Sequence, residues 1–210
     1  MIITKTKDLE SILDLIKSEP VFIVGCSECA TLCKTGGEDE VKEMTKVLKD
    51  KNIEVTGSVV LDPACHLLND KRILKGYKTE LGKAKKVLVL ACGNGVQTVA
   101  EIIQDADVVP GLDTLFLGEI KRLNDFERRC NLCGECIQYL FDGLCPISRC
   151  PKNMLNGPCG GSTNGKCEIS KDMDCVWELI IKKLEEKGKL DTLKKLVEPK
   201  DWSKSLEMKR

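Results

Sequence analysis

Two hydrophobic periods alternate along the first part of the chain. Residues 5–18 carry apolar side chains at helical spacing and are followed by Pro20, and residues 38–51 repeat this amphipathic pattern. Between them, residues 21–24 form a continuous run of β-branched and aromatic residues, which is typical of a buried strand. The remaining segments keep this order: apolar runs at 53–61 and 87–91, a lysine-rich helical stretch to about residue 85, a helix at 94–105, and short strands at 108–109 and 114–117.

Strands that alternate with helices in this way form a parallel sheet with right-handed crossovers. Residues 1–120 are therefore expected to be a small parallel α/β domain. Three of the expected strands run directly into a segment with a cysteine, at Cys26, Cys65 and Cys92. Because the carboxyl ends of parallel strands meet at one edge of a sheet, we expect these three thiols to lie near one another.

The pattern changes after residue 120. Residues 121–130 form a charged connector that is expected to be helical, and residues 131–172 are rich in Gly, Pro and Asn with little apolar periodicity. Such a segment buries too little apolar surface to order itself without help. An amphipathic helix from residue 176, a short helix at 189–197 and a polar tail complete the chain. The predicted domains are 1–120, 121–180 and 181–210.

The predicted fold class is thus α/β, with a small parallel-sheet N-terminal domain, a loop-rich and cysteine-dense module, and C-terminal helices. Lys plus Arg and Asp plus Glu each number 33, and aromatic residues make up only 4% of the chain. Such a composition gives no overall field for nucleic acid and few rings for base stacking. No apolar run has the length of a membrane span or a signal peptide, so we expect a cytoplasmic protein without membrane insertion.

The chain holds 13 cysteines, which in a reducing compartment favour metal or cluster binding over disulfides. Eight of them gather in the second part of the chain: Cys130, Cys133, Cys136, Cys145, Cys150, Cys159, Cys167 and Cys175. The C-x-x-C-x-x-C triplet that opens this group suits the corner of an iron–sulfur cube, and eight thiolates would complete two [4Fe-4S] clusters. A pair of Cys₄ zinc sites is the alternative. Spacing alone does not say which four cysteines share a cluster.

The other five cysteines lie in the predicted α/β domain. Cys26, Cys29 and Cys33 form a three-ligand run, with either Cys65 or Cys92 as the fourth ligand of a third cluster or a zinc ion. The alternative is a strand-end turn with incidental thiols. His66, the only histidine, is interpreted as structural, and the Gly93–Gly95 turn is a weak signal for a phosphate site. We find no acid–base pair or P-loop, so the chain is expected to lack a complete active site of its own.

A longer motif carries a resemblance. Cys150-Pro151-Lys152-Asn153 is followed by Asn156-Gly157-Pro158-Cys159-Gly160-Gly161, by Cys167-Glu168 and by Cys175-Val176-Trp177, and an N-terminal C-x-x-C-x-x-x-C-x-T-G-G runs from Cys26 to Gly37. These strings resemble the small subunit, of the MetV type, of methylenetetrahydrofolate reductase from acetogen-like bacteria. That resemblance implies an accessory iron–sulfur subunit with the eight C-terminal cysteines as cluster ligands. Of the N-terminal set, Cys26, Cys29 and Cys33 match best.

The resemblance also implies a partner and a pathway. The partner would be a flavin-containing catalytic subunit that reduces methylene- to methyltetrahydrofolate, in one-carbon metabolism of the Wood–Ljungdahl type. Electrons would come from ferredoxin or from another electron-input subunit, and the helix at 173–187 and the tail at Trp202 are candidates for docking. A zinc-stabilised scaffold without a redox role is the main alternative. A stand-alone enzyme built on the Gly93–Gly95 turn is a third, weakened by the missing acid–base pair.

Overall fold

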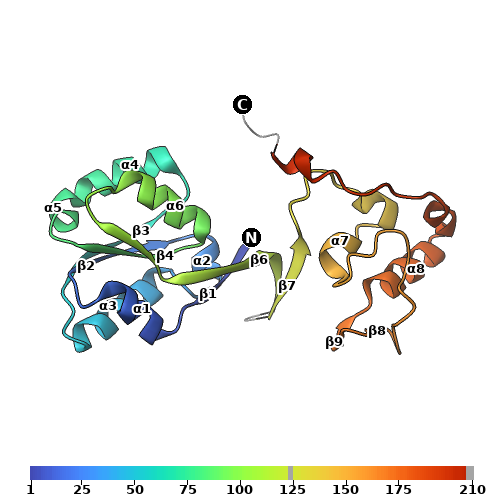
Figure 1. Ribbon diagram of the computed structural model, residues 1–210, viewed down its shortest axis with the longest axis horizontal. Helices are drawn as coiled ribbons and strands as arrows, with labels where there is room; N and C mark the ends of the chain where they lie inside the picture. Colours follow the sequence, from blue (N-terminus) through green and yellow to red (C-terminus); the bar gives the residue numbers. More distant parts are fainter. Residues whose placement is uncertain (123–124, 207–210) are drawn as a thin grey trace. The chain divides into compact units, whose positions relative to one another are not determined.

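The computed structural model describes residues 1–122 and 125–206 of the chain, and these form two compact units (Figure 1). The first unit consists mainly of Met1–Phe116. The second consists mainly of Leu117–Lys121 and of the chain from Asp125 onward. Each unit has its own cluster of buried apolar side chains, so each is described by itself.

The first unit is built on a four-stranded sheet in the order β3-β2-β4-β5, with every neighbouring pair parallel. Its strands are β2 (Val21–Cys26), β3 (Val55–Leu61), β4 (Lys86–Leu90) and β5 (Asp107–Pro110). Helices connect the strands, as the alternating pattern predicts. The predicted α/β class with a parallel N-terminal sheet is confirmed.

Helices cover both faces of this sheet (Figure 1). Helices α1 and α3 lie on one face, and α4, α5 and α6 lie on the other. Their bounds are Leu9–Ile16 for α1, Glu38–Asp50 for α3, Leu67–Leu74 for α4, Lys78–Leu81 for α5 and Gly93–Ile102 for α6, with a short α2 at Cys29–Leu32 and a 3₁₀ turn η1 at Lys75–Tyr77. Two covered faces explain why β2 and β4 read as continuous apolar runs rather than alternating ones.

The centre of the first unit is closely packed around Gly25 near the end of β2. A Cβ built on Gly25 would lie 2.6 Å from the Gly36 carbonyl oxygen and 2.6 Å from a Val41 methyl group. No side chain larger than hydrogen fits between the strand and α3 at these distances. The glycine therefore lets the loop before α3 lie directly on the end of β2.

The beginning of the chain differs from the expectation. Residues Ile2–Thr6 form a strand, β1, which pairs with β6 (Leu112–Arg122) outside the parallel sheet. The first helix begins only at Leu9, because Asp8 caps it and accepts a hydrogen bond of 2.9 Å from the Ser11 amide. The predicted helical start at residue 5 is thus wrong by four residues.

The connector at 121–130 is also different from the prediction, apart from residues 123 and 124, which lie outside the described residues. Asp125–Cys130 is a strand, β7, paired with β6, and not a helix. Opposite charges stabilise this pairing, because Glu127 pairs with Lys121 and Arg129 pairs with Glu119. The charged residues that suggested an exposed helix are cross-strand partners.

The second unit has a small core beneath helix α8 (Val176–Glu186). Trp177 is 1% exposed, packs edge-to-face on Phe141 at 5.4 Å between ring centroids, and donates a hydrogen bond of 2.9 Å to the Met154 carbonyl. Short elements surround it: η2 (Gln138–Phe141), α7 (Pro146–Arg149), the antiparallel pair β8 (Lys166–Cys167) and β9 (Ser170–Asp174), η3 (Leu190–Lys194) and η4 (Trp202–Leu206). The short helix predicted at 189–197 is a 3₁₀ segment.

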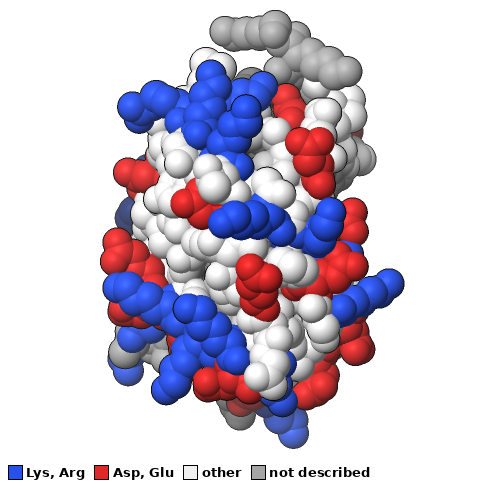
Figure 2. All heavy atoms as spheres, turned by 90° about the vertical axis from the view of Figure 1, so that its left-hand side faces the viewer, with Lys and Arg blue, Asp and Glu red and all other residues white. Residues whose placement is uncertain are grey.

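On the face of the molecule in Figure 2, basic side chains gather at the top and lower left, acidic side chains lie between and beside them, and neither sign covers the face. Within the described residues, every helix is too short or too polar to cross a bilayer.

Candidate metal centres

Four thiols of the first unit gather at the carboxyl edge of its sheet. Cys26 is the last residue of β2, Cys65 lies in the turn that follows β3, and Cys92 caps the N-terminus of α6 directly after β4. Cys29 begins α2, three residues after Cys26. Since β2 lies between β3 and β4 in parallel register, the three strand ends are neighbours, as the sequence pattern predicts.

The other charged or ionisable groups at this edge affect the pKa of Cys65. Partial burial raises the pKa of the Cys65 thiol, and the thiols of Cys92 and Cys26, the Asp70 carboxylate and the Cys29 thiol raise this pKa further. Each of these groups would carry negative charge when ionised, so together they disfavour another anion. A bound cation would remove this repulsion.

Cys33 has a different environment. It is 6% exposed, and its thiol donates to the Ile2 carbonyl oxygen at 3.7 Å. The Ile2 amide in turn donates to the Cys29 sulfur at 3.4 Å. Strand β1 therefore holds the Cys33 thiol, whereas Cys29 is near both β1 and the thiols at the sheet edge.

A buried carboxylate lies beside this edge. Asp70 in α4 is 0% exposed, and its Oδ2 accepts a hydrogen bond of 3.1 Å from the His66 amide. Its Oδ1 has no hydrogen-bond partner among the residues that the structure describes. Burial raises the pKa of Asp70 despite the opposing contribution of His66. The sequence pattern did not indicate Asp70, because an Asp on a lysine-rich helix is usually solvated.

The other two candidates at this edge have structural explanations. His66 precedes α4 as its N-cap residue, and its Nδ1 accepts a hydrogen bond of 3.2 Å from the Asn69 amide, in line with a structural histidine. In the Gly93–Gly95 turn, the Gly93 amide donates 2.8 Å to the Thr114 hydroxyl. A Cβ on Gly95 would lie 2.8 Å from that of Ala91, so close packing accounts for this glycine.

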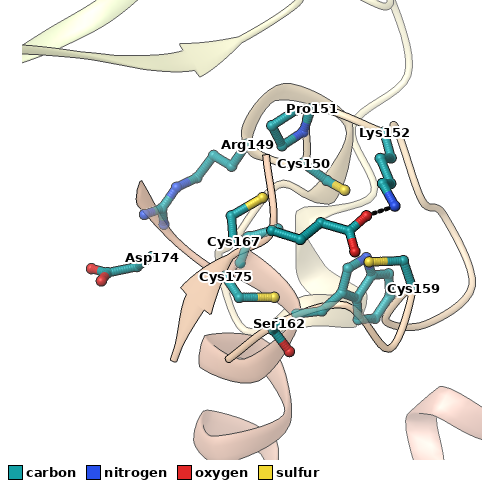
Figure 3. Close-up of a pocket in the computed structure, with 12 residues that line it drawn as sticks. Arg149, Cys150, Pro151, Lys152, Cys159, Ser162, Cys167, Asp174 and Cys175 are labelled. Carbon is teal, nitrogen blue, oxygen red and sulfur yellow. Dashed lines mark ion pairs between the residues drawn. The ribbon is translucent and has the colours of Figure 1, made fainter. Parts of the chain in front are cut away.

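In the second unit, one pocket brings together four of the eight cysteines. Its sulfur-bearing lining residues are Cys150, Cys159, Cys167 and Cys175. Figure 3 shows these four sulfurs facing a common space from different segments of the chain. Buried Val176 and Trp177 form part of the wall. Four thiolates in one apolar-backed pocket are the donor set of a [4Fe-4S] cluster or of a structural zinc.

Local structure explains why these distant cysteines meet. Cys150 is the C-cap of α7 and Cys175 is the N-cap of α8. The Cys175 amide donates 2.8 Å to the Gly165 carbonyl, which fixes the β8–β9 hairpin, with Cys167, against the start of α8. Cys159 lies between Gly157 and Gly160, both with positive φ, and its sulfur accepts a contact of 3.5 Å from the Gly161 amide.

Charged groups line the same pocket. Lys152 forms an ion pair with Glu168. In Figure 3 this ion pair is the dashed line that begins at the labelled Lys152. Gly161 makes room for this pair, because a Cβ there would overlap the Glu168 carboxylate. Arg149 also lines the pocket, and it pairs with Glu127 of β7 at 2.8 Å. Lys152 and Glu168 lie within the motif that carries the resemblance, but spacing did not indicate that they pair.

The remaining four cysteines are Cys130, Cys133, Cys136 and Cys145. Cys130 ends β7, and its sulfur accepts a hydrogen bond of 3.3 Å from the Leu132 amide. Leu132 has a left-handed backbone, with a φ of 56°. Cys145 is the N-cap of α7 and, like Cys133, packs against the core of the unit. The pocket described above thus brings together four of the eight cysteines, and the remaining four are not among its lining residues.

The C-terminal segment around Lys204 lies against the loop that carries Cys133 and Cys136. Lys200 and Lys204 pair with Glu135, and a Cβ on Gly134 would lie 2.5 Å from backbone atoms of Lys204 and Ser205. The two lysines lower the pKa of Glu135, with Lys204 contributing most. This contact was not visible in the sequence, where the tail reads as polar and loose.

Over the described residues, no group of three or more His, Cys, Asp or Glu side chains converges tightly enough to hold a single metal ion. The cysteines are therefore near one another without a defined ion position, and their assignment as ligands stays a prediction.

Residues 109–203 match a family model described as "Methylene-tetrahydrofolate reductase C terminal". This supports a protein related to methylenetetrahydrofolate reductase, and the matched segment contains all eight C-terminal cysteines. No curated protein and no solved structure matches the chain. The first unit, apart from its last residues, lies outside the matched segment.

Proposed function

We propose that this chain is the iron–sulfur, electron-transferring subunit of a methylenetetrahydrofolate reductase complex. Two [4Fe-4S] clusters in the second unit would carry electrons from ferredoxin, or from another electron-input subunit, to the flavin of a catalytic partner. The observation that carries the proposal is the pocket with four cysteines inside the segment that resembles methylenetetrahydrofolate reductase. The proposed role is accessory, with folate and flavin bound by the partner.

The eight cysteines match the ligand number of two cubes. Cys150, Cys159, Cys167 and Cys175, which line one pocket, would hold one cluster, and the remaining Cys130, Cys133, Cys136 and Cys145 would hold the other. When bound, a four-iron cluster accepts and releases one electron at a time, so two transfers reduce a flavin by two electrons.

The surrounding protein supplies the groups that tune such centres. The amides of Leu132 and Gly161 already donate to the sulfurs of Cys130 and Cys159, one in each set. Hydrogen bonds to sulfur stabilise the more negative, reduced state and so raise the reduction potential. Lys152 would act in the same direction, to the extent that Glu168 leaves its charge uncompensated.

The first experiment is metal analysis of protein purified without oxygen, with EPR spectroscopy before and after dithionite. We expect about eight irons and eight sulfides per chain from the second unit, and a reduced-cluster signal. Stoichiometric zinc in place of iron would overturn the electron-transfer role and favour the zinc-stabilised scaffold. Reduction of the catalytic subunit's flavin by dithionite-reduced chain then tests transfer directly.

Paired substitutions test the division into two sets. Cys150→Ser with Cys167→Ser lies within one set, so the double variant should lose about four irons, as either single variant does. Cys133→Ser with Cys167→Ser joins both sets and should lose about eight. Equal loss from the two double variants would contradict the division but not cluster binding itself.

A further inference from the structure

The carboxyl edge of the first sheet has a constellation that the proposed function leaves unused. Four cysteines from three strand ends and a short helix lie along this edge: Cys26, Cys29, Cys65 and Cys92. This edge lies outside the segment matched by the reductase family model. Its chemistry must therefore be judged from its own residues.

The topology of the sheet fixes this constellation. Cys26 lies opposite Leu61 at the end of β3, and its neighbour Gly25 lies opposite Leu90 at the end of β4. Cys65 and Cys92 follow these two strand ends within four and two residues. Because β2 is buried along its whole length and β4 along most of its length, the packed sheet fixes these strand ends without any metal.

Asp70 is a second, independent sign of a ligand at this edge. A buried carboxylate oxygen without a partner costs free energy, and native structures rarely leave one. Its Oδ2 is fixed by the His66 amide, next in sequence to Cys65, while Oδ1 lacks a partner among the described side chains and backbone. Since the other oxygen of this carboxylate is held by the residue that follows Cys65, a metal centre or its ligand shell at this edge would satisfy Oδ1.

We propose that this edge binds a thiolate-held metal centre, separate from those of the second unit, with Cys26, Cys29, Cys65 and Cys92 as its ligands. Cys33 is not a ligand, because β1 holds its thiol at the Ile2 carbonyl. Spacing left open whether Cys65 or Cys92 is the fourth ligand. The proposed site includes both of them and omits Cys33. The class of centre is a four-iron cluster or a Zn²⁺ ion, both of which accept four thiolates.

Metal analysis of single variants of the full chain, purified without oxygen, tests this assignment. Cys65→Ser and Cys92→Ser should each lower the metal content by about four irons and four sulfides, or by about one zinc. Cys33→Ser is the matched control and should keep the wild-type content. Loss of metal from Cys33→Ser, or unchanged content in both other variants, would overturn the proposal.

Alkylation of the wild-type chain gives a second measurement that needs no variant to fold. Cys65 is exposed, so without a metal iodoacetamide can reach its thiol. We expect Cys65 to be protected in protein as purified and to react at least roughly tenfold faster after treatment with a strong chelator, as expected for a thiolate released from a metal. An equal rate before and after chelation contradicts a centre at this edge.

Asp70→Asn sharpens the role of the buried carboxylate. The amide keeps the shape of the side chain but removes its charge, and loss of such a supporting group typically weakens metal affinity by about 10–100-fold. The readout is the chelator concentration that removes half of the metal from the first unit. Retention equal to wild type would exclude Asp70 from the site. None of these measurements depends on the clusters of the second unit, so the two proposals fail separately.

Discussion

The two units differ in how the protein around their cysteines is stabilised. In the first, 23 buried residues form one apolar cluster, which includes Cys26 but none of the other cysteines of the unit. In the second, seven buried residues form the core, and cysteines pack directly against it as part of the structure. A metal centre would be an addition to the first unit but a structural element of the second.

Metal removal should therefore separate the two units most clearly. Because so small a core supports the second unit, we expect chelation to lower the hydrogen-exchange protection of α8 by at least about a hundredfold. The protection of β2 and β4 should stay within about threefold, since buried sheet strands open only on global unfolding. Exchange mass spectrometry of the full chain measures both, and equal loss in the two units would refute the contrast.

Aromatic truncations should give the next largest effect. Trp177→Ala and Phe22→Ala each remove a ring that is at most 1% exposed, and each should cost about 3–5 kcal/mol of stability. Only Trp177→Ala should also lower the metal content of the cysteine pocket, because Trp177 lines its wall. Unfolding by urea and metal analysis check the two parts, and a pocket that stays fully loaded would contradict the link between core and metal.

Overpacking tests the rigidity of the first unit. Gly25→Ala places a methyl group 2.6 Å from both Gly36 and Val41, and should cost about 1–3 kcal/mol in the urea-unfolding free energy. Gly76→Ala is the matched control, because a Cβ at Gly76 meets nothing within 4 Å. Loss of stability in the control alone would show that packing at Gly25 is looser than the distances indicate.

A smaller effect is expected at Glu127 in the β6–β7 pair. Burial opposes ionisation of Glu127, but its pairs with Lys121, Arg149 and Arg129 outweigh it and lower the pKa below 4.5. A lowered folded-state pKa stabilises the fold above the unfolded value, and this contribution is lost as the pH falls through the folded value. Glu127→Gln should therefore cost about 1 kcal/mol at pH 7, a cost that shrinks only below pH 4.5.

The comparison for Glu127 is an exposed pair in the first unit. Lys42 and Glu38 in α3 are 3.4 Å apart and more than 70% exposed, so Lys42→Met should change stability by less than about 0.5 kcal/mol. Circular dichroism during urea titration measures both variants. Equal costs at Glu127 and Lys42 would mean that the charge network of the hairpin adds nothing to an ordinary surface pair.

Sequence reasoning recovered the parallel sheet because a strand buried on both faces, such as Val21–Val24, has a pattern that no amphipathic helix shares. It also placed Cys26, Cys65 and Cys92 at one edge, since that follows from parallel topology alone. Strand β7 was mistaken for a helix because its alternating charges satisfy either period until the partner strand is known. Asp70 could not be indicated from the sequence, and neither could the contact of Cys33 with Ile2, because burial and long-range contacts arise only in three dimensions.

Helix α7 has a consequence of its own. It is four residues long, with Cys145 as its N-cap and Cys150 as its C-cap, so it joins a member of each thiol set. At about 1.5 Å of rise per residue, one helical turn is all that separates those two ligands along the chain. If both sets are loaded, the backbone of α7 would be the shortest covalent path along the chain between the two centres.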